Sequence, residues 1–475
     1  MFLERVYDRG LAQASFVVGC AATGEAVVVD PIRDVEPYLA IAEREGFRIT
    51  HVTETHIHAD YVSGARELAH RTGAKLFLSA EGGEEWQYAF ASEAGAQLLR
   101  DGDSFMVGNI KIEARHTPGH TPEHLTFLVT DTPAGDEPMG AFTGDFIFVG
   151  DVGRPDLLEK AAKVQDTMEI GARQLFQSLQ AFKELPDHLQ IWPGHGAGSA
   201  CGKSLGAVPQ STLGYEKQVN WAFQHDDEES FVRAVLEGQP DPPMYFAEMK
   251  RVNREGPDIL GDREPPAWLA FKDLDRLQGT DALLVDARPR KAFQESHIPG
   301  FHSIPLGRSF STWAGSVLPF RRPIALILPD EDEAMALWAR RELEVIGLDQ
   351  LEGVWGPQVV EEWEKAGHTP EEVEEISADE VAHRMENGAL QVVDVRTSTE
   401  WGEGHIPGSV NVPLGRLPEG VENLPADVPL VVHCNTGPRA MVALAALRAQ
   451  GLDPVLHLEG DMAGWKSQGR PVASG

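Results

Sequence analysis

Thr55-His56-Ile57-His58-Ala59-Asp60-Tyr61 is the stretch that decides the fold of the N-terminal half of the chain. It comes directly after a strand-like run over residues 48–54, where a strand is expected to give way to a turn. Three later turns contain His116-Thr-Pro-Gly-His120, Thr143-Gly-Asp145 and Trp192-Pro-Gly-His195. An α/β scaffold presents ligand-binding side chains at such strand ends. The sequence therefore predicts one cluster of candidate metal ligands: His56, His58, Asp60, His120, Asp145 and His195.

The residue types in this cluster indicate the kind of metal. Imidazole and carboxylate groups suit borderline first-row transition metals, and none of the four turns contains cysteine. A lone histidine in a turn is more often a helix cap or a surface residue, but six candidate ligands in four turns outweigh that explanation. His116 fits it better and is expected to be a structural residue at a strand end.

These motifs resemble those of the metallo-β-lactamase superfamily, and the resemblance covers nearly all of residues 1–235. It implies a four-layer αβ/βα sandwich with metal at one edge. Dinuclear members of the glyoxalase II type carry H-x-H-x-D-H, whereas here Tyr61 takes the place of the last histidine. This departure is compatible with the persulfide dioxygenase branch, which holds one iron. The resemblance to that branch implies His56, His120 and Asp145 as the iron ligands.

Two histidines and one carboxylate, with the remaining positions open, also form the ligand set of non-haem Fe(II) oxygenases. Zinc has no redox chemistry, so zinc in the same place would favour hydrolysis. Around an iron, His58, Asp60 and His195 are expected to orient the ligands or the bound oxygen. Arg154, shortly after Asp145, is a candidate anchor for an anionic thiol substrate, with a loop-stabilising ion pair as the alternative.

Cys201 lies six residues after His195, in a Gly-rich segment that also contains Lys203. Such a loop beside a metal site could keep the thiol accessible and lower its pKa. We therefore predict a catalytic role for Cys201, as an acceptor of sulfur that is passed to the metal. The alternative is inert packing, which is the role expected for Cys20.

The C-terminal half contains an internal repeat. The segment Asp286-Ala-Arg288, followed by His297-Ile-Pro-Gly300, recurs 108 residues later as Asp394-Val-Arg396 followed by His405-Ile-Pro-Gly408. In both copies short apolar strands alternate with helical stretches, which is typical of a small parallel α/β domain. Two homologous units of roughly 100 residues are therefore predicted.

The second repeat contains a thiol loop, Cys434-Asn-Thr-Gly437-Pro-Arg439, between an apolar strand and a helix. Backbone N–H groups of the loop and the helix N-terminus surround the sulfur with positive potential and stabilise a thiolate or a persulfide. Arg439 adds a fixed cation. Together with His405-Ile-Pro-Gly, the loop resembles the active loop of a rhodanese, which implies that Cys434 carries sulfane sulfur. A phosphatase is the alternative, but a loop of six rather than seven residues favours sulfur over phosphate.

The first repeat lacks this chemistry. Leu328 aligns with Cys434, and the loop that follows, Pro329-Asp-Glu-Asp-Glu333, is acidic. Its charge would repel a persulfide, and it offers no nucleophile. The first repeat is therefore expected to be an inactive rhodanese-like domain that spaces or docks the two active ones.

Composition bounds the partners and the compartment. The chain of 475 residues has a net charge of −33, so nucleic acid and anionic membranes would repel it. It contains no apolar run long enough to span a membrane. Three widely separated cysteines argue against a disulfide framework, so a cytoplasmic protein with free thiols is expected. A homo-oligomer is expected.

The sequence as a whole predicts an α/β protein that fuses two enzymes. The predicted segments are a metallo-β-lactamase-like domain over residues 1–236, a linker over 237–268, an inactive rhodanese-like domain over 269–370 and an active rhodanese over 371–475. The predicted reaction is oxidation of a low-molecular-weight thiol persulfide by O₂ to sulfite at one Fe(II), for which zinc could substitute. The rhodanese would exchange sulfur with thiols, sulfite or thiosulfate, as in sulfide detoxification. The alternatives are a zinc thioester hydrolase of the glyoxalase II type and a non-catalytic sulfur carrier or sensor.

Overall fold

The computed structural model of the protein describes residues 1–157 and 167–474. The chain divides into two compact units, residues 1–263 and 264–475. The first unit contains two six-stranded sheets. The first sheet has the order β1 (Phe2–Asp8), β2 (Gln13–Cys20), β3 (Glu25–Val29), β4 (Arg48–Thr53), β5 (Lys75–Ser79), β6 (Gln97–Leu99). The second has the order β12 (Ser211–Thr212), β11 (Gln190–Pro193), β10 (Gly140–Gly144), β9 (Leu125–Asp131), β8 (Ile110–His116), β7 (Ser104–Val107).

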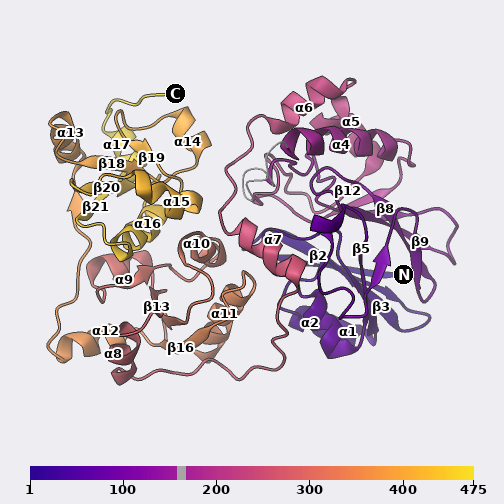
Figure 1. The fold of residues 1–475 in the computed structure, drawn as a ribbon, viewed down its shortest axis with the longest axis horizontal. Helices are drawn as coiled ribbons and strands as arrows, with labels where there is room; N and C mark the ends of the chain where they lie inside the picture. The colour runs from indigo at the N-terminus through magenta and orange to yellow at the C-terminus, as the bar shows by residue number, and fades with distance from the viewer. Residues whose placement is uncertain (158–166, 475) are drawn as a thin grey trace. The chain divides into compact units, whose positions relative to one another are not determined.

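The two sheets bury a shared apolar core, which is why several strands are apolar on both faces. Phe16 and Val29 of the first sheet lie in one cluster with Phe127, Phe142 and Trp192 of the second. The outer face of the second sheet packs on α4 (Thr167–Phe182) and α6 (Glu228–Leu236). Helices α1 (Glu36–Glu45) and α2 (Ala65–Thr72) contact β4 of the first sheet. Helix layers therefore lie on both sides of the strands, and the predicted four-layer sandwich is confirmed (Figure 1).

Strand direction brings the four polar turns to one edge. Strands β3 to β6 run parallel, and the segment with the two histidines begins where β4 ends. Strands β10 and β11 are also parallel, with Gly144 opposite Pro193, so Asp145 and His195 follow neighbouring strands. Parallel strands end at the same edge of a sheet, which places these side chains close together.

The second unit contains two parallel sheets that repeat one strand order. The first repeat has the order β14 (His302–Ser303), β13 (Leu283–Asp286), β15 (Ile324–Ile327), β16 (Leu351–Trp355). The second has the order β19 (Val410–Asn411), β18 (Gln391–Asp394), β20 (Leu430–His433), β21 (Val455–Leu458), β17 (Glu375–Ile376). The order of the first four strands is the same, so the internal repeat in the sequence is a repeat of structure.

The shared Asp-x-Arg motif of the repeats has a structural role. Arg288 holds Asp286 with a two-pronged ion pair and also donates to the carbonyl of Ser296. Arg396 makes the same contacts with Asp394 and with the carbonyl of Gly404. Each arginine therefore ties the end of a central strand to the turn that follows the next helix.

Helix α16 (Pro438–Ala449), directly after the thiol loop, is buried on all sides. All eight residues 440–447 are buried, although a helix on one face of a sheet normally exposes a polar stripe. The face of α16 that points away from its own sheet is covered by the first repeat, since α16 packs on β14, α9 (Arg290–Glu295) and α10 (Phe310–Val317). The first repeat therefore packs directly on the helix that follows the thiol loop of the second.

The remaining helices are short. Among residues 1–157 and 167–263 they are α5 (Leu213–Val219) and α7 (Phe246–Glu255), and α7 lies inside the stretch predicted as a linker. In the second unit they are α8 (Lys272–Gln278), α11 (Glu333–Glu344), α12 (Val359–Lys365), α13 (Ala378–Glu386), α14 (Ser398–Glu403), α15 (Leu417–Gly420) and α17 (Asp461–Ser467). None of the helices in the described ranges has the length and apolar character needed to cross a membrane.

Candidate metal centre and thiol loop

Three of the predicted ligands meet at one buried point. Donor atoms of His56, His120 and Asp145 all lie within 4.8 Å of one another, and Nε2 of His120 is 3.5 Å from Oδ2 of Asp145. All three side chains are buried. The structure thus brings together the three residues that the persulfide dioxygenase resemblance singled out.

The contacts around these three side chains leave the donor atoms available to a cation. Nδ1 of His56 lies 3.0 Å from the hydroxyl of Thr55, and Nδ1–H of His120 donates to the carbonyl of Arg154. The other ring nitrogen of each histidine is therefore the one free for a metal. Neither carboxylate oxygen of Asp145 has a hydrogen-bond partner among the described residues. A buried carboxylate without a partner is costly, so this donor set fits a metal ion.

Protonation states agree with that fit. Burial and the neighbouring histidines lower the pKa of His56 well below its usual value, and burial lowers that of His120. Burial alone would raise the pKa of Asp145, but the histidines facing it hold it below its usual value. Neutral imidazoles and an ionised carboxylate are the forms that bind a metal.

Asp60, His195 and Cys201 form a second group of donors beside the first. Their donor atoms also lie within 4.8 Å of one another. Nε2 of His195 is 3.3 Å from Oδ2 of Asp60 and 3.5 Å from Oδ1 of Asp145, so Asp145 borders both groups. Asp60 and His195 are thus placed as possible ligands of a second ion as well as neighbours of the first.

The predicted environment of Cys201 is wrong. Its thiol is buried, with 2% of the residue exposed, and burial together with Asp60 and Asp145 raises its pKa well above the usual value. Lys203 does not offset this, because its ammonium donates to the carbonyl of Ala234 and lies over the ring of Trp221. Proximity in sequence suggested a cation beside the thiol, whereas the fold places carboxylates there.

The thiol loop lies at the N-terminal end of α16. Cys434 follows β20, its sulfur accepts a hydrogen bond of 3.1 Å from the N–H of Gly437, and its own N–H donates to Asp461. Arg439 makes a two-pronged ion pair with Glu400, at 2.6 and 2.8 Å. In the first repeat Leu328 lies at the position equivalent to Cys434, at the end of β15, and is fully buried. Of the two equivalent loops, the one in the second repeat therefore has a sulfur that accepts a backbone hydrogen bond.

Comparisons with known proteins agree with this geometry. Residues 8–195 match the metallo-beta-lactamase superfamily. The crystal structure of a metallo-beta-lactamase from Staphylococcus aureus is 45% identical, covers 75% of this chain and 99% of that chain, and superposes with a TM-score of 0.68. The chain belongs to the metallo-β-lactamase superfamily. Residues 377–468 match the rhodanese-like domain, so the thiol loop lies in a second family.

Curated relatives match about two fifths to half of this chain. A beta-lactamase hydrolase-like protein of Xylella fastidiosa is 30% identical over 285 residues, which are 54% of this chain and 60% of the relative. The mitochondrial persulfide dioxygenase ETHE1 of Homo sapiens is 29% identical over 198 residues, 41% of this chain and 68% of the relative. Hydroxyacylglutathione hydrolases also match. The chain spans about half to three quarters of the length of the first curated relatives.

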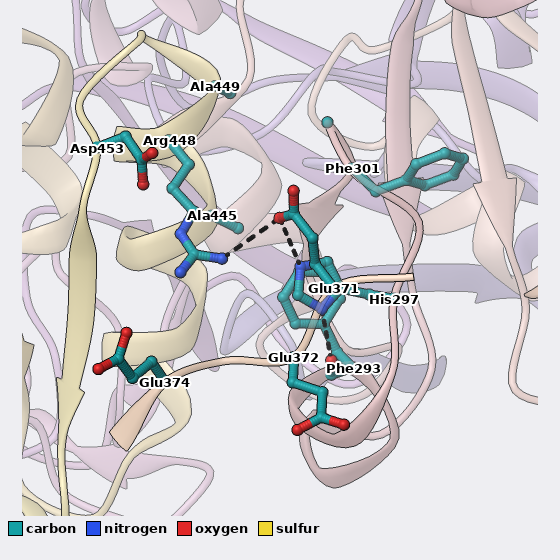
Figure 2. Close-up of a pocket in the computed structure, with 11 residues that line it drawn as sticks. Phe293, His297, Phe301, Glu371, Glu372, Glu374, Ala445, Arg448, Ala449 and Asp453 are labelled. Atoms are coloured by element: carbon teal, nitrogen blue, oxygen red, sulfur yellow. Dashed lines mark hydrogen bonds and ion pairs between the residues drawn. The ribbon is translucent and has the colours of Figure 1, made fainter. Parts of the chain in front are cut away.

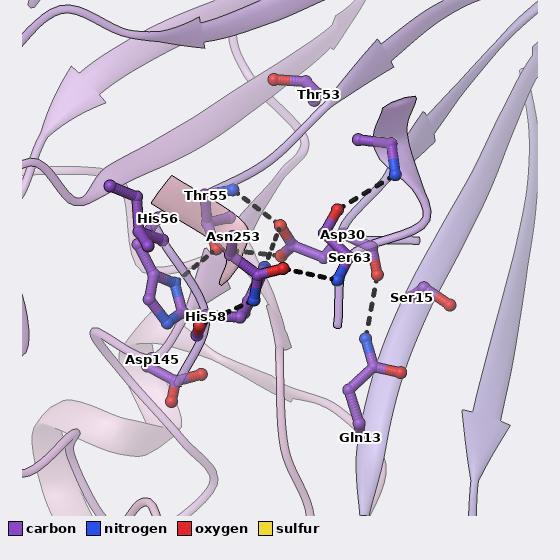
Figure 3. Close-up of polar contacts among 12 residues, drawn as sticks. Gln13, Ser15, Asp30, Thr53, Thr55, His56, His58, Ser63, Asp145 and Asn253 are labelled. Carbon is purple, nitrogen blue, oxygen red and sulfur yellow. Dashed lines mark hydrogen bonds and ion pairs between the residues drawn. The ribbon is translucent and has the colours of Figure 1, made fainter. Parts of the chain in front are cut away.

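Asp30 holds the histidine-rich turn of the metallo-β-lactamase domain, and the sequence analysis missed it. Its carboxylate accepts hydrogen bonds from the N–H and the hydroxyl of Thr55 and lies 3.2 Å from Nε2 of His58 (Figure 3). Burial would lower the pKa of His58, but Asp30 outweighs it and raises the pKa to about 9. His58 is therefore held by Asp30 and is not free to bind a metal through Nε2.

Asn253 of α7 braces the same turn from a distant part of the chain. Its amide donates to the carbonyls of His58 and Tyr61, and its oxygen accepts from the N–H of Ser63 (Figure 3). The Pro-rich composition of residues 237–268 indicated only a linker. The helix instead contributes a buried amide to the metallo-β-lactamase domain. The asparagine in the last turn of that helix gave no sequence signal for this role.

Arg154 is fully buried and its guanidinium is occupied. It makes a two-pronged ion pair with Asp156, at 2.7 Å for both contacts, and donates to the carbonyl of Ala200. Its own carbonyl orients His120. These contacts favour the loop-stabilising alternative over the predicted substrate anchor.

The second unit also contains a cavity of about 410 Å³, at the end of α16 opposite the thiol loop. Arg448 faces it together with Glu371, which lies 3.7 Å from both Arg448 and His297 (Figure 2). Three further carboxylates line it, and its arginine is paired, so the cavity is not part of the sulfur chemistry at Cys434.

Proposed function

We propose that the metallo-β-lactamase domain is an iron-dependent persulfide dioxygenase and that the C-terminal rhodanese-like domain transfers sulfur through Cys434. The observation that carries the first half is the buried set of His56, His120 and Asp145, two neutral imidazoles and a carboxylate that accepts no hydrogen bond from the described residues. The 29% identity to a persulfide dioxygenase supports it. The second half rests on the sulfur of Cys434, which faces a backbone N–H at 3.1 Å.

Iron(II) bound by these three side chains would supply the redox chemistry by which O₂ converts the outer sulfur of a persulfide to sulfite. The chain's own residues prepare the site. Asp30 fixes the turn that carries His56, and the carbonyl of Arg154 fixes the ring of His120. Burial keeps both imidazoles neutral and excludes bulk water from the carboxylate of Asp145. The proposed substrate is a small thiol persulfide.

The rhodanese-like domain would exchange sulfur with the same pool of compounds. The thiolate of Cys434 attacks the outer sulfur of thiosulfate, and sulfite leaves with the electron pair of the broken sulfur–sulfur bond. The N–H of Gly437 donates to the Cys434 sulfur and stabilises its negative charge. One product of this step, sulfite, is also the product of the dioxygenase, so the fused activities share a metabolite.

A zinc-dependent thioester hydrolase is the second candidate, and one observation favours it. Asp60, His195 and Cys201 offer a second set of donors next to the first, as a dinuclear hydrolase requires. The matches to hydroxyacylglutathione hydrolases fit that function. Metal identity and number separate the two candidates.

The deciding experiment is metal analysis of anaerobically purified full-length chain, with oxygen uptake measured on several persulfides. We expect about one iron per chain and rapid oxygen uptake. His56→Ala should remove both iron and uptake, because a three-ligand site has no spare ligand. His58→Ala should retain much of the iron. Cys434→Ser should abolish thiosulfate sulfurtransferase activity and leave uptake intact. Two zinc ions per chain, with thioester hydrolysis and no oxygen uptake, would establish the hydrolase instead.

A further inference from the structure

The first repeat reaches the thiol loop of the second through one arginine. Arg290 is the first residue of α9, and α9 packs on α16, the helix that the loop precedes. Nη1 of Arg290 donates a hydrogen bond of 2.9 Å to the carbonyl of Thr436, in the middle of the loop. A guanidinium from the inactive repeat therefore rests on the active loop.

Gly437 shows how closely the guanidinium approaches. A Cβ atom on Gly437 would lie 1.6 Å from Nη1 of Arg290, so the arginine occupies the space that a side chain would need. The N–H of the same glycine donates to the sulfur of Cys434. The cation thus lies against the peptide unit that holds the sulfur.

Arg290 makes no ion pair with the described residues, whereas Arg439 is paired with Glu400. Glu400 takes both prongs of Arg439, and this pair outweighs the effect of burial and lowers the pKa of Glu400 to about 2. Among the residues that the structure describes, no carboxylate lies within ion-pair distance of Arg290. The carboxylate behind the loop, Asp461, already accepts from the N–H of Cys434 and faces His457 at 3.3 Å.

The two repeats differ at the positions that supply these charges. Arg290 stands where the second repeat has Ser398, and Ala292 stands where it has Glu400. The first repeat thus lacks the carboxylate that pairs with the loop cation in the second, and has instead a cation that reaches the other loop. A purely supporting domain needs neither difference.

We propose that Arg290 of the inactive repeat binds the anionic end of the sulfur donor at the Cys434 loop, and so completes the active site of the second repeat. The proposal rests on the sulfurtransferase function proposed above. It specifies donors whose outer sulfur is attached to a sulfonate-type anion, of which thiosulfate is the probe. Two negative charges on thiosulfate must approach one on the thiolate, and a nearby fixed cation offsets that repulsion. The positive charge also stabilises the sulfite that leaves when the sulfur–sulfur bond breaks.

The test uses the full-length chain with thiosulfate as donor and cyanide as acceptor. Cyanide takes the outer sulfur from the Cys434 persulfide as thiocyanate and restores the thiolate. Arg290→Ala should raise the KM for thiosulfate by about tenfold or more, because a charge-assisted contact is lost, and should flatten the dependence of KM on ionic strength. Arg290→Gln keeps a polar side chain but lacks the charge, so it should behave like alanine. Arg290→Lys should recover most of the affinity.

Two controls separate anion binding from support of the loop. Lys291→Ala removes a neighbouring exposed cation that pairs with Glu295 of its own helix, and should leave KM unchanged. Alkylation of Cys434 by neutral iodoacetamide, followed by mass spectrometry, should not slow in the Arg290 variants. Wild-type kinetics in Arg290→Gln, or slowed alkylation with an unchanged KM, would refute anion binding and leave the sulfurtransferase function standing. Absence of thiosulfate turnover in the wild type would refute that function, and the proposal with it.

Discussion

Gly437 is the residue on which the geometry of the thiol loop depends. Its φ of +104° is a conformation that residues with a side chain rarely adopt. A Cβ there would also lie 3.0 Å from the buried carboxylate of Asp461. The loop therefore has room for glycine alone at the position that donates to the Cys434 sulfur.

Gly437→Ala should abolish most sulfurtransferase activity while leaving metal content and oxygen uptake unchanged. The substitution costs about 1–2 kcal/mol in backbone conformation, and the added Cβ must also displace the guanidinium of Arg290 from the loop. Thiosulfate kinetics and iron analysis on the same preparation measure the two effects. Gly451→Ala is the matched control, since Gly451 has a φ of +86° but open space around it. Equal losses in both variants would show that backbone strain, and not the loop contact, is responsible.

Single residues also show how far the sequence could predict the site. His56, His120 and Asp145 could be predicted because each directly follows or ends a recognisable strand-to-turn motif. Asp30 and Asn253 could not, since they meet the turn from positions 25 and about 190 residues away. The environment of Cys201 was mispredicted for the same reason. Burial and the carboxylates of Asp60 and Asp145, which are distant in sequence, raise the pKa of its thiol.

At the scale of elements, α7 shows that a segment with the composition of a linker can belong to a domain. Residues 237–245 and 256–268 contain many Pro, Gly and charged residues, which indicate an irregular chain. Yet Phe246, Met249 and Asn253 of the helix between them are buried. Packing on the histidine-rich turn, which composition does not reveal, decides its place in the fold.

Asn253→Ala should loosen the turn that carries His56 and His58. Three buried backbone groups lose their partners, so we expect a loss of about 2–4 kcal/mol of stability in the first unit. Hydrogen exchange of peptides covering residues 55–65 should accelerate, and iron content should fall. Arg251→Ala, on the exposed side of α7, should leave both nearly unchanged. Unaltered exchange in Asn253→Ala would mean that the turn holds without α7.

The His-Ile-Pro-Gly turns of the two repeats support helices and do not take part in the chemistry. Nδ1–H of His297 donates to the carbonyl of Phe293, and its ring stacks on that side chain at 3.9 Å. His405 makes the same contacts with Trp401. The motif identified the repeat correctly, and the structure explains it as a helix-end contact.

His297 should make the first repeat less stable in mild acid. Burial lowers its pKa from 6.5 to about 4, so the unfolded chain binds more protons between these pH values. Stability conferred by the neutral imidazole is complete above pH 6.5 and declines as the pH falls toward 4, by about 1–3 kcal/mol. Thermal unfolding at pH 7.5 and at pH 4.5 should show a smaller shift for His297→Gln than for wild type. Equal shifts would assign the acid sensitivity elsewhere, His302 being the next candidate.

At the scale of the whole molecule, repeats and motifs in the sequence predicted the fold class. They did not predict the contact between the first repeat and the Cys434 loop of the second. The offset of 108 residues predicted two similar α/β units, and the strand orders agree. Pairwise matching of the two copies also showed that the first lacks a nucleophile. It could not show that α9 lies on the active loop, because that depends on the contact between the copies.

The complete burial of α16 has a consequence for how the second unit behaves as a folding entity. Without the first repeat, one face of this helix would present its Ala, Val, Leu and Met side chains to water. A truncated protein that keeps only the last hundred residues would therefore be prone to aggregate. Loss of the first repeat should therefore destabilise the second through lost burial alone, apart from any effect on the thiol loop.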